Sequence, residues 1–166
     1  MVQFIVTLFL SWHLSLSGWA DAPLAQAVLY PPALSYSEAE LVDRDFSNQK
    51  LAAAEFAGCT LRSVDFNHAD LRGTTFSVSW MNDVDFSGAD LSNAMLDQVS
   101  FINTDLRDSI LTDTIWLRSS FENVKIEGAD FTDAILDGAQ VQQLCQIARG
   151  INSKTGVATR DSLYCR

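Results

Sequence analysis

A large apolar residue recurs every five residues from Leu41 to Leu136, and this spacing restricts the backbone more than any other feature of the sequence. All twenty positions of the series hold Leu, Phe, Met, Ile or Trp, without an insertion. In an α-helix a step of five residues rotates the side chain by about 500°, so no apolar stripe forms. In a flat strand an odd step moves each side chain to the opposite face. The repeat therefore fits neither ordinary element.

The residues that flank each apolar centre indicate a coiling chain. Two positions before the centre, 18 of the 20 units hold Ala, Cys, Ser, Thr or Val, the exceptions being Arg44 and Gln49. Two positions after it, 14 of the 20 units hold Gly, Asn or Asp, which accept tight and left-handed turns at low cost. Each unit is thus predicted to be a short straight side followed by a corner.

A second period, of twenty residues, predicts four units per turn. Phenylalanine recurs at Phe46, Phe66 and Phe86, and aspartate occupies the position before the centre at Asp45, Asp65, Asp85 and Asp105. With four sides per turn, each of these sets forms a vertical stack.

The "ADL" segments at 69–71 and 89–91 and the "ADF" segment at 129–131 resemble pentapeptide-repeat proteins. The resemblance implies an all-β solenoid, a right-handed quadrilateral β-helix of about five coils over residues 39–141. At a strand separation of about 4.8 Å, five coils form a column about 24 Å tall. The apolar centres fill its interior, and Cys59, at a small inward position, is predicted to be a packing residue.

The first coil is expected to be covered by an N-terminal cap at residues 28–38, because a solenoid end needs protection from aggregation. Ser35 and Glu38 have the spacing of a capping box and predict a short helix. Arg44 and Gln49 are expected to face this cap.

Residues 142–166 are assigned to a C-terminal cap. Val141, Leu144, Cys145 and Ala148 share one face of a predicted helix, and Gly150 suits its end. The tail resembles those of exported cyanobacterial and thylakoid-lumen pentapeptide-repeat proteins, which implies a disulfide between Cys145 and Cys165. Two cysteines in an exported chain favour a bridge, and a loop of this length gives about 3 kcal/mol in the chain-entropy model. A zinc site is the alternative, but the tail contains no His.

The N-terminal segment is predicted to be a secretory signal. An apolar run from Phe4 to Leu16 precedes the small-x-small sequence Ala25-Gln26-Ala27, so the signal spans 1–27 and export to a periplasm or thylakoid lumen is expected. Retention as a membrane anchor is the alternative, although the run is shorter than the roughly 20 residues of a span. No Lys or Arg precedes Arg44, so the true start could lie upstream.

Composition and motifs argue against several functions. With 21 acidic and 11 basic residues, the chain is not expected to bind nucleic acid by neutralising phosphates. No phosphate-binding loop, nucleophile elbow or paired cysteine redox motif occurs, and His68 falls at an outward corner. The sequence thus predicts a protein without enzymatic activity, cofactor or catalytic residues.

Two surface rows are candidate sites. The acidic strip, Asp45, Asp65, Asp85 and Asp105, brings like charges within about 5 Å, at about 1 kcal/mol per pair in water. These carboxylates are expected to accept backbone N–H groups at the corners, the alternatives being a cationic partner or Ca²⁺.

The apolar row consists of Met95, Ile115 and Ile135, with Leu117 beside it, on the side opposite the acidic strip. Exposed apolar stripes mark contacts, so this row predicts a partner surface unless the C-terminal helix or a second copy covers it. An Ile115→Asp substitution is expected to abolish partner capture without lowering stability.

The favoured function is a non-enzymatic exported scaffold that binds an unidentified protein, with the mature chain off the membrane as a monomer or weak dimer. The alternative is a DNA-mimicking topoisomerase (gyrase) inhibitor of the pentapeptide-repeat type, a class that the sequence also resembles. An ice-binding solenoid is disfavoured because matched Thr rows are missing.

Overall fold

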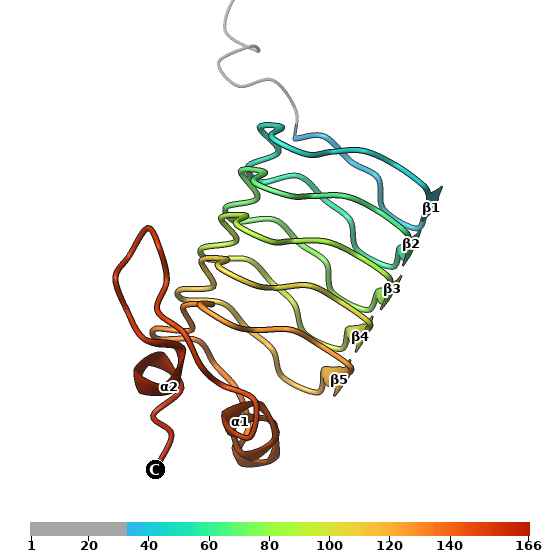
Figure 1. Ribbon diagram of the computed structural model, residues 1–166. Coiled ribbons are helices and arrows are strands. Elements are labelled where there is room, and N and C mark those ends of the chain that lie inside the picture. The colour runs from blue at the N-terminus through green and yellow to red at the C-terminus, as the bar shows by residue number, and fades with distance from the viewer. Residues whose placement is uncertain (1–32) are drawn as a thin grey trace, which may run out of the picture. The chain divides into compact units, whose positions relative to one another are not determined.

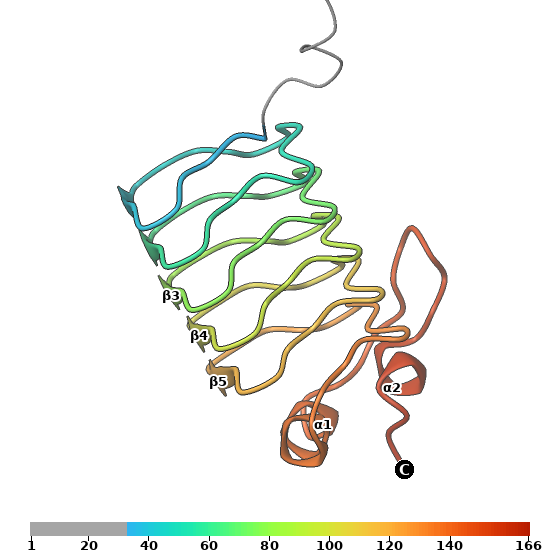
Figure 2. The ribbon, with the colours of Figure 1, turned by 180° about the vertical axis from the view of Figure 1, so that it is seen from behind.

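The computed structural model describes residues 33–166 as one compact unit, and the predicted signal at 1–27 lies outside the described residues. Five short strands stack in one parallel sheet in the order of the sequence (Figures 1 and 2). The strands are β1 (Glu40–Val42), β2 (Thr60–Arg62), β3 (Trp80–Asn82), β4 (Ser100–Ile102) and β5 (Ser120–Glu122). Within the described part of the chain, no helix is long and apolar enough to cross a membrane.

Each residue of a strand lies opposite the residue twenty positions later in the next strand, as the longer period predicts. Leu41 lies opposite Leu61 and Met81 opposite Phe101 in this sheet. The other three sides of the coil are joined by parallel bridges with the same spacing of twenty. We call the side of Asp45 and Asp65 face 1, that of Asp70 and Asp90 face 2, that of Met95 and Ile115 face 3, and the β1–β5 sheet face 4. The quadrilateral solenoid is therefore confirmed.

The solenoid has about four turns, counted from β1 to β5, slightly fewer than the five coils that twenty apolar centres suggested. Five stacked strands delimit four turns, and the units after β5 have a cap instead of another coil below them. Nineteen of the twenty centres are buried, and only Leu136, the last, is partly exposed.

The corners follow the predicted positions closely. Every corner from Glu38 to Asp133, at intervals of five residues, has a positive φ. Glycine adopts this conformation without strain, whereas Val78 (φ 61°) places a β-branched side chain in the left-handed region. Small polar residues fit the inward position because their hydroxyls donate to backbone carbonyls, as Thr74 does to Leu71 O at 2.7 Å and Ser79 to Phe56 O at 2.9 Å.

Two aromatic ladders form the upper core. On face 1, Phe46, Phe66 and Phe86 stack with ring centroids 5.1 Å apart. On face 3, Phe56 and Phe76 stack at 4.9 Å, and each meets a ring of the face 1 ladder edge to face.

The capping helix predicted from Ser35 and Glu38 is wrong. Ser35 forms a parallel bridge with Glu55, and Glu38 is a corner with φ 60°. Tyr36 adds a unit before Leu41, because its ring stacks on Phe56 at 4.8 Å and its N–H donates to Glu55 O. Aromatic stacking thus extends the coil where capping chemistry predicted a helix.

Arg44 and Gln49, predicted to face an N-terminal cap, are both exposed, and no capping helix forms at residues 35–38. The Arg44 guanidinium lies 5.8 Å from the centroid of the Phe46 ring, and Gln49 donates through Nε2 to Asp45 O. Both side chains lie outside the core of the first coil.

The C-terminal cap contains α1 (Gly138–Cys145) and α2 (Thr159–Ser162). The repeat ends at Asp137, not at Val141, because Asp137 and Gln140 form a capping box that starts the helix. Leu144 and Ala148 are buried as predicted, while Val141 is half-buried. Gly150 is not the helix stop, since α1 ends at Cys145.

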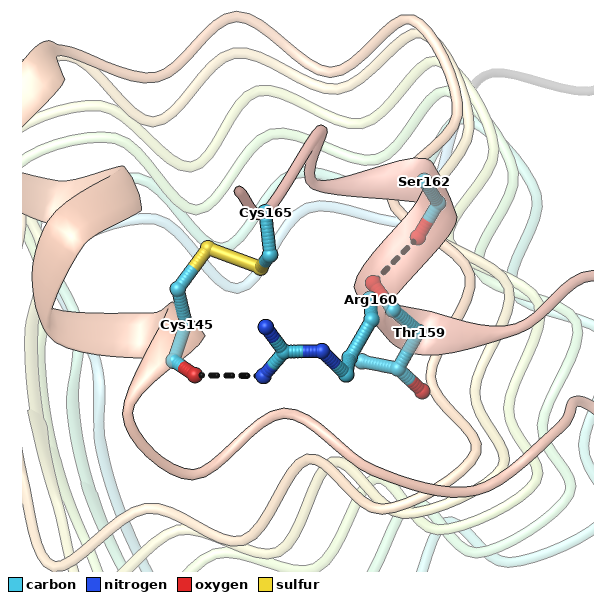
Figure 3. Close-up of a disulfide and its surroundings, with 5 residues drawn as sticks. All are labelled: Cys145, Thr159, Arg160, Ser162 and Cys165. Atoms are coloured by element: carbon cyan, nitrogen blue, oxygen red, sulfur yellow. Dashed lines mark hydrogen bonds between the residues drawn. A yellow bond between two sulfur atoms is a disulfide. The ribbon is translucent and has the colours of Figure 1, made fainter.

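The cap closes the bottom of the core through side chains. Gln140 Nε2 donates to Trp116 O and Ser119 O at 2.7 and 2.8 Å. On face 2, the Phe131 N–H donates to Ser162 Oγ, and on face 4 Gln143 Nε2 donates to Phe121 O. The predicted disulfide joins Cys145 to Cys165, with Cα atoms 5.6 Å apart (Figure 3).

The loop between α1 and α2 runs beside the corners that join faces 1 and 2 (Figure 1). Asn152 Nδ2 donates to Ser109 O and Gly128 O, and Lys154 Nζ donates to Gly88 O at 2.6 Å. Gly150 is required here, because a Cβ on it would lie 2.8 Å from Gly128 N. The disulfide therefore closes a loop that clamps three coils.

Candidate partner-binding surface

The acidic strip on face 1 makes the hydrogen bonds expected of corner residues. Each carboxylate accepts the backbone N–H two residues later, from Ser47, Asn67, Ser87 and Arg107 respectively, at 2.7–3.1 Å. These bonds satisfy the N–H groups that the turn leaves without a ladder partner. The strip is thus part of the corner structure.

Asp105, at the lower end of the strip, has two basic neighbours. Arg107 donates to both of its carboxylate oxygens, and Lys125 Nζ lies 3.4 Å away. Burial alone would raise the pKa of Asp105, but the hydrogen bonds and charges of Arg107 and Lys125 together hold it below the usual range. Within residues 33–166, no three acidic, His or Cys side chains gather as metal ligands.

A second acidic column on face 2 was missed in the sequence analysis. Asp70, Asp90 and Asp130 occupy the same position in their units and also accept the N–H two residues later. The Arg72 side chain donates two hydrogen bonds to Asp70, which holds the pKa of that carboxyl below its usual range. The spacing of twenty, applied to every unit, would have found this column.

The apolar row lies in register on face 3. Thr75, Met95, Ile115 and Ile135 form successive parallel bridges, so their side chains stack on one side of the column. Met95 is 44% exposed, Ile135 51% and the neighbouring Leu117 41%, whereas Ile115, between them, is half-buried. The C-terminal helix leaves this row exposed.

Two further exposed apolar residues lie at the border of faces 3 and 4. Val78 is the corner between faces 3 and 4 and is 62% exposed, and Trp80 begins β3 on face 4 at 38% exposed. The sequence contained a signal for Val78, since it is the one β-branched residue among the corners. Val78 thus combines an exposed apolar side chain with a left-handed backbone conformation that β-branched residues rarely adopt.

The remaining candidates lie where packing alone explains them. Cys59 is buried, its Sγ donates to Tyr36 O at 3.1 Å, and burial raises the pKa of its thiol. His68 is an exposed corner whose ring occupies the space beside Gly88.

The fold and its surfaces define a class: a four-sided parallel β-solenoid with stacked apolar centres, outward polar corners and a disulfide-closed C-terminal cap. The pentapeptide repeats profile matches residues 39–77 and 81–113 in eight copies. The crystal structure of a pentapeptide repeat protein from the Arabidopsis thaliana thylakoid lumen superposes with a TM-score of 0.77 at 35% identity, over 78% of this chain and 90% of that one. The chain belongs to the pentapeptide-repeat family.

Two curated relatives from Arabidopsis thaliana are thylakoid lumenal proteins. Thylakoid lumenal protein TL20.3 is 61% identical over 41 residues, which are 25% of this chain and 15% of the relative. Thylakoid lumenal 15 kDa protein 1 is 51% identical over 47 residues, 28% of this chain and 21% of the relative. The matches therefore span only a small part of each relative's length.

Proposed function

We propose that the chain is an exported, non-enzymatic scaffold that binds a protein partner through the apolar surface of face 3 and its border with face 4. The thylakoid lumenal relatives and the disulfide support an oxidising compartment outside the cytosol, the thylakoid lumen being favoured over a periplasm. The observation that carries the proposal is the row of Met95, Ile115 and Ile135, which stays half-exposed to exposed on a rigid column.

Rigidity is the physical reason that such a surface suits binding. Each side of the column is held by parallel bridges above and below, so the exposed side chains lose little backbone entropy when a partner docks. Trp and Met are enriched at interface cores, and Trp80 and Met95 belong to this surface.

The DNA-mimic alternative draws less support from the column. A mimic of the phosphate backbone needs an uninterrupted acidic face, and on face 1 the last aspartate, Asp105, is flanked by Arg107 and Lys125. Apolar groups on face 3 also have no role in that mechanism.

The test is partner capture from thylakoid lumen extract by the immobilised mature chain and by matched variants. Met95→Asp and Ile135→Asp should reduce the captured partner at least about tenfold, because each buries a charge in an apolar contact. Val42→Asp is the control, since Val42 on face 4 is exposed to the same 44% as Met95. Ile115→Asp is unsuitable alone, because Ile115 is half-buried and its loss would also lower stability.

Equal capture by all three variants, at unchanged melting temperature, would refute the proposal. Recovery of this chain itself as the captured species would replace the foreign partner by a second copy.

A further inference from the structure

The last rung of face 1 has two backbone groups without partners among residues 33–166. On the rungs above, the N–H of each centre donates to the coil below, as Phe66 does to Asp85 O at 2.7 Å and Leu106 to Lys125 O at 2.8 Å. The Ile126 N–H would donate in the same direction, and Val124 O would accept an N–H from the same place, but neither forms such a bond in the described chain. The two groups flank Lys125 in the pattern of a parallel bridge that lacks its partner.

The path of the C-terminal cap explains why these groups are unpaired. Along the last coil, backbone pairing resumes at Gly128, one hydrogen-bonding position after Ile126. The Gly128 N–H donates to Arg149 O at 2.9 Å, so the tail pairs with the corner after Ile126 but not with Ile126 itself. Helix α1 ends at Cys145 on the side of face 4, where Gln143 reaches Phe121 O. Between these two contacts, the Asn123 N–H, Val124 O and the Ile126 N–H form no backbone hydrogen bond within the described chain.

A cleft of about 230 Å³ lies over this rung. Its lining combines the apolar residues Val124, Ile126 and Ile147 with the charged residues Arg107, Lys125, Glu127 and Arg149. Three basic side chains thus gather at one place on a chain whose net charge is -10. Lys125 and Arg149 keep 65% and 75% of their side-chain surface exposed, although they lie near Asp105 and Glu127.

The order of residues along face 1 indicates the charge of the missing partner. Asp45, Asp65, Asp85 and Asp105 are followed in the same column by Lys125. An acidic side chain at the next place would face Lys125 from below, as Asp105 faces it from above, with Arg149 beside it. An extended backbone there would satisfy both unpaired groups of the rung.

We infer that the last rung of face 1 binds an extended, acidic peptide segment of a partner protein, which adds one residue to the column in parallel. The N–H of that residue donates to Val124 O, and its carbonyl oxygen accepts the Ile126 N–H. Its Asp or Glu carboxylate lies beside Lys125 and Arg149. This is strand addition at an unpaired edge, with main-chain bonds giving affinity and charge giving selectivity. The site is separate from face 3 and does not depend on the function proposed above.

Titration of the isotopically labelled chain with three blocked pentapeptides, acetylated and amidated, tests the inference by NMR. The first peptide carries one central aspartate among small residues, the second asparagine in its place, and the third an N-methylated aspartate that has no N–H. The first should move the Ile126 amide proton downfield in a saturable way, because that proton gains an acceptor. The second and third should each bind several-fold more weakly, for loss of charge and of the bond to Val124 O.

Charge reversal supplies the matched variants. Lys125→Glu should weaken binding of the aspartate peptide by about tenfold, since one attraction near 4 Å becomes a repulsion. Lys50→Glu changes the net charge equally at an exposed position on face 2 and should leave the affinity within about twofold. Met95→Asp should have no effect, which separates failure here from failure of the face 3 proposal.

Three results would overturn the inference. The N-methylated peptide could bind as tightly as its parent, or acetate alone could reproduce the shift at Ile126, so that only an anion binds. A shift of the Ile126 amide with protein concentration, without peptide, would instead assign the edge to a second copy.

Discussion

The aromatic ladder of face 1 makes a quantitative prediction about Phe66. Its ring is fully buried and lies between Phe46 and Phe86, with centroids 5.1 Å away on both sides. Phe56 and Phe76 contact it edge to face at 5.4 and 5.8 Å. Phe66→Ala therefore removes a full aromatic side chain and leaves a cavity between closely stacked coils, which should lower the free energy of unfolding by about 3–5 kcal/mol.

A leucine at the same position separates ring contacts from volume. Phe66→Leu keeps most of the buried apolar volume but loses four aromatic pairs, and should cost about 1–2 kcal/mol. Val42→Ala, at a half-exposed site on face 4, should stay within about 0.5 kcal/mol.

Guanidinium unfolding followed by circular dichroism measures these differences. The denaturant slope of each variant must match the parent, because solenoids can unfold in parts. If Phe66→Ala costs less than about 1 kcal/mol, the stacked interior does not stabilise the column and the reasoning fails.

Three further predictions concern the corners, the cap and acid stability. Val78→Asn should stabilise the chain by about 0.5–1 kcal/mol, since Asn tolerates the left-handed φ. Gly73→Ala should cost about 1 kcal/mol of backbone strain, although a Cβ there meets nothing within 4 Å. Calorimetry that shows the opposite signs would contradict this reasoning. Cys165→Ser should cost about 3 kcal/mol, measured against the parent under oxidising conditions, and an equal melting temperature would exclude a stabilising bridge. The lowered pKa of Asp105 contributes stability above the ordinary aspartate pKa of about 3.9, and this is lost as pH falls through the lower folded value. Arg107→Gln should therefore flatten the fall of melting temperature between pH 5 and 2, and an unchanged slope would refute the pairing.

The apolar row was predictable from the sequence, but its extent was not. The period of twenty placed Met95, Ile115 and Ile135 on one side, because stacking follows directly from four units per turn. Exposure is not periodic, however, and only the structure shows that Ile115 is half-buried between exposed neighbours. Trp80 escaped notice because it lies across a corner from the row.

The sequence alone determined the solenoid, its corners and its core, because every unit repeats the same local rule and contacts only the coils above and below it. The tertiary structure alone decided the two ends, where the rule stops and long-range contacts compete. Tyr36 extends the first coil by stacking on a ring twenty residues away, where local capping chemistry predicted a helix. At the other end, Asp137 starts α1, Asn152 and Lys154 bind distant corners, and the tail rejoins the ladder at Arg149. The unpaired edge beside Ile126 results from that competition between local capping and distant pairing, and no repeat pattern could have revealed it.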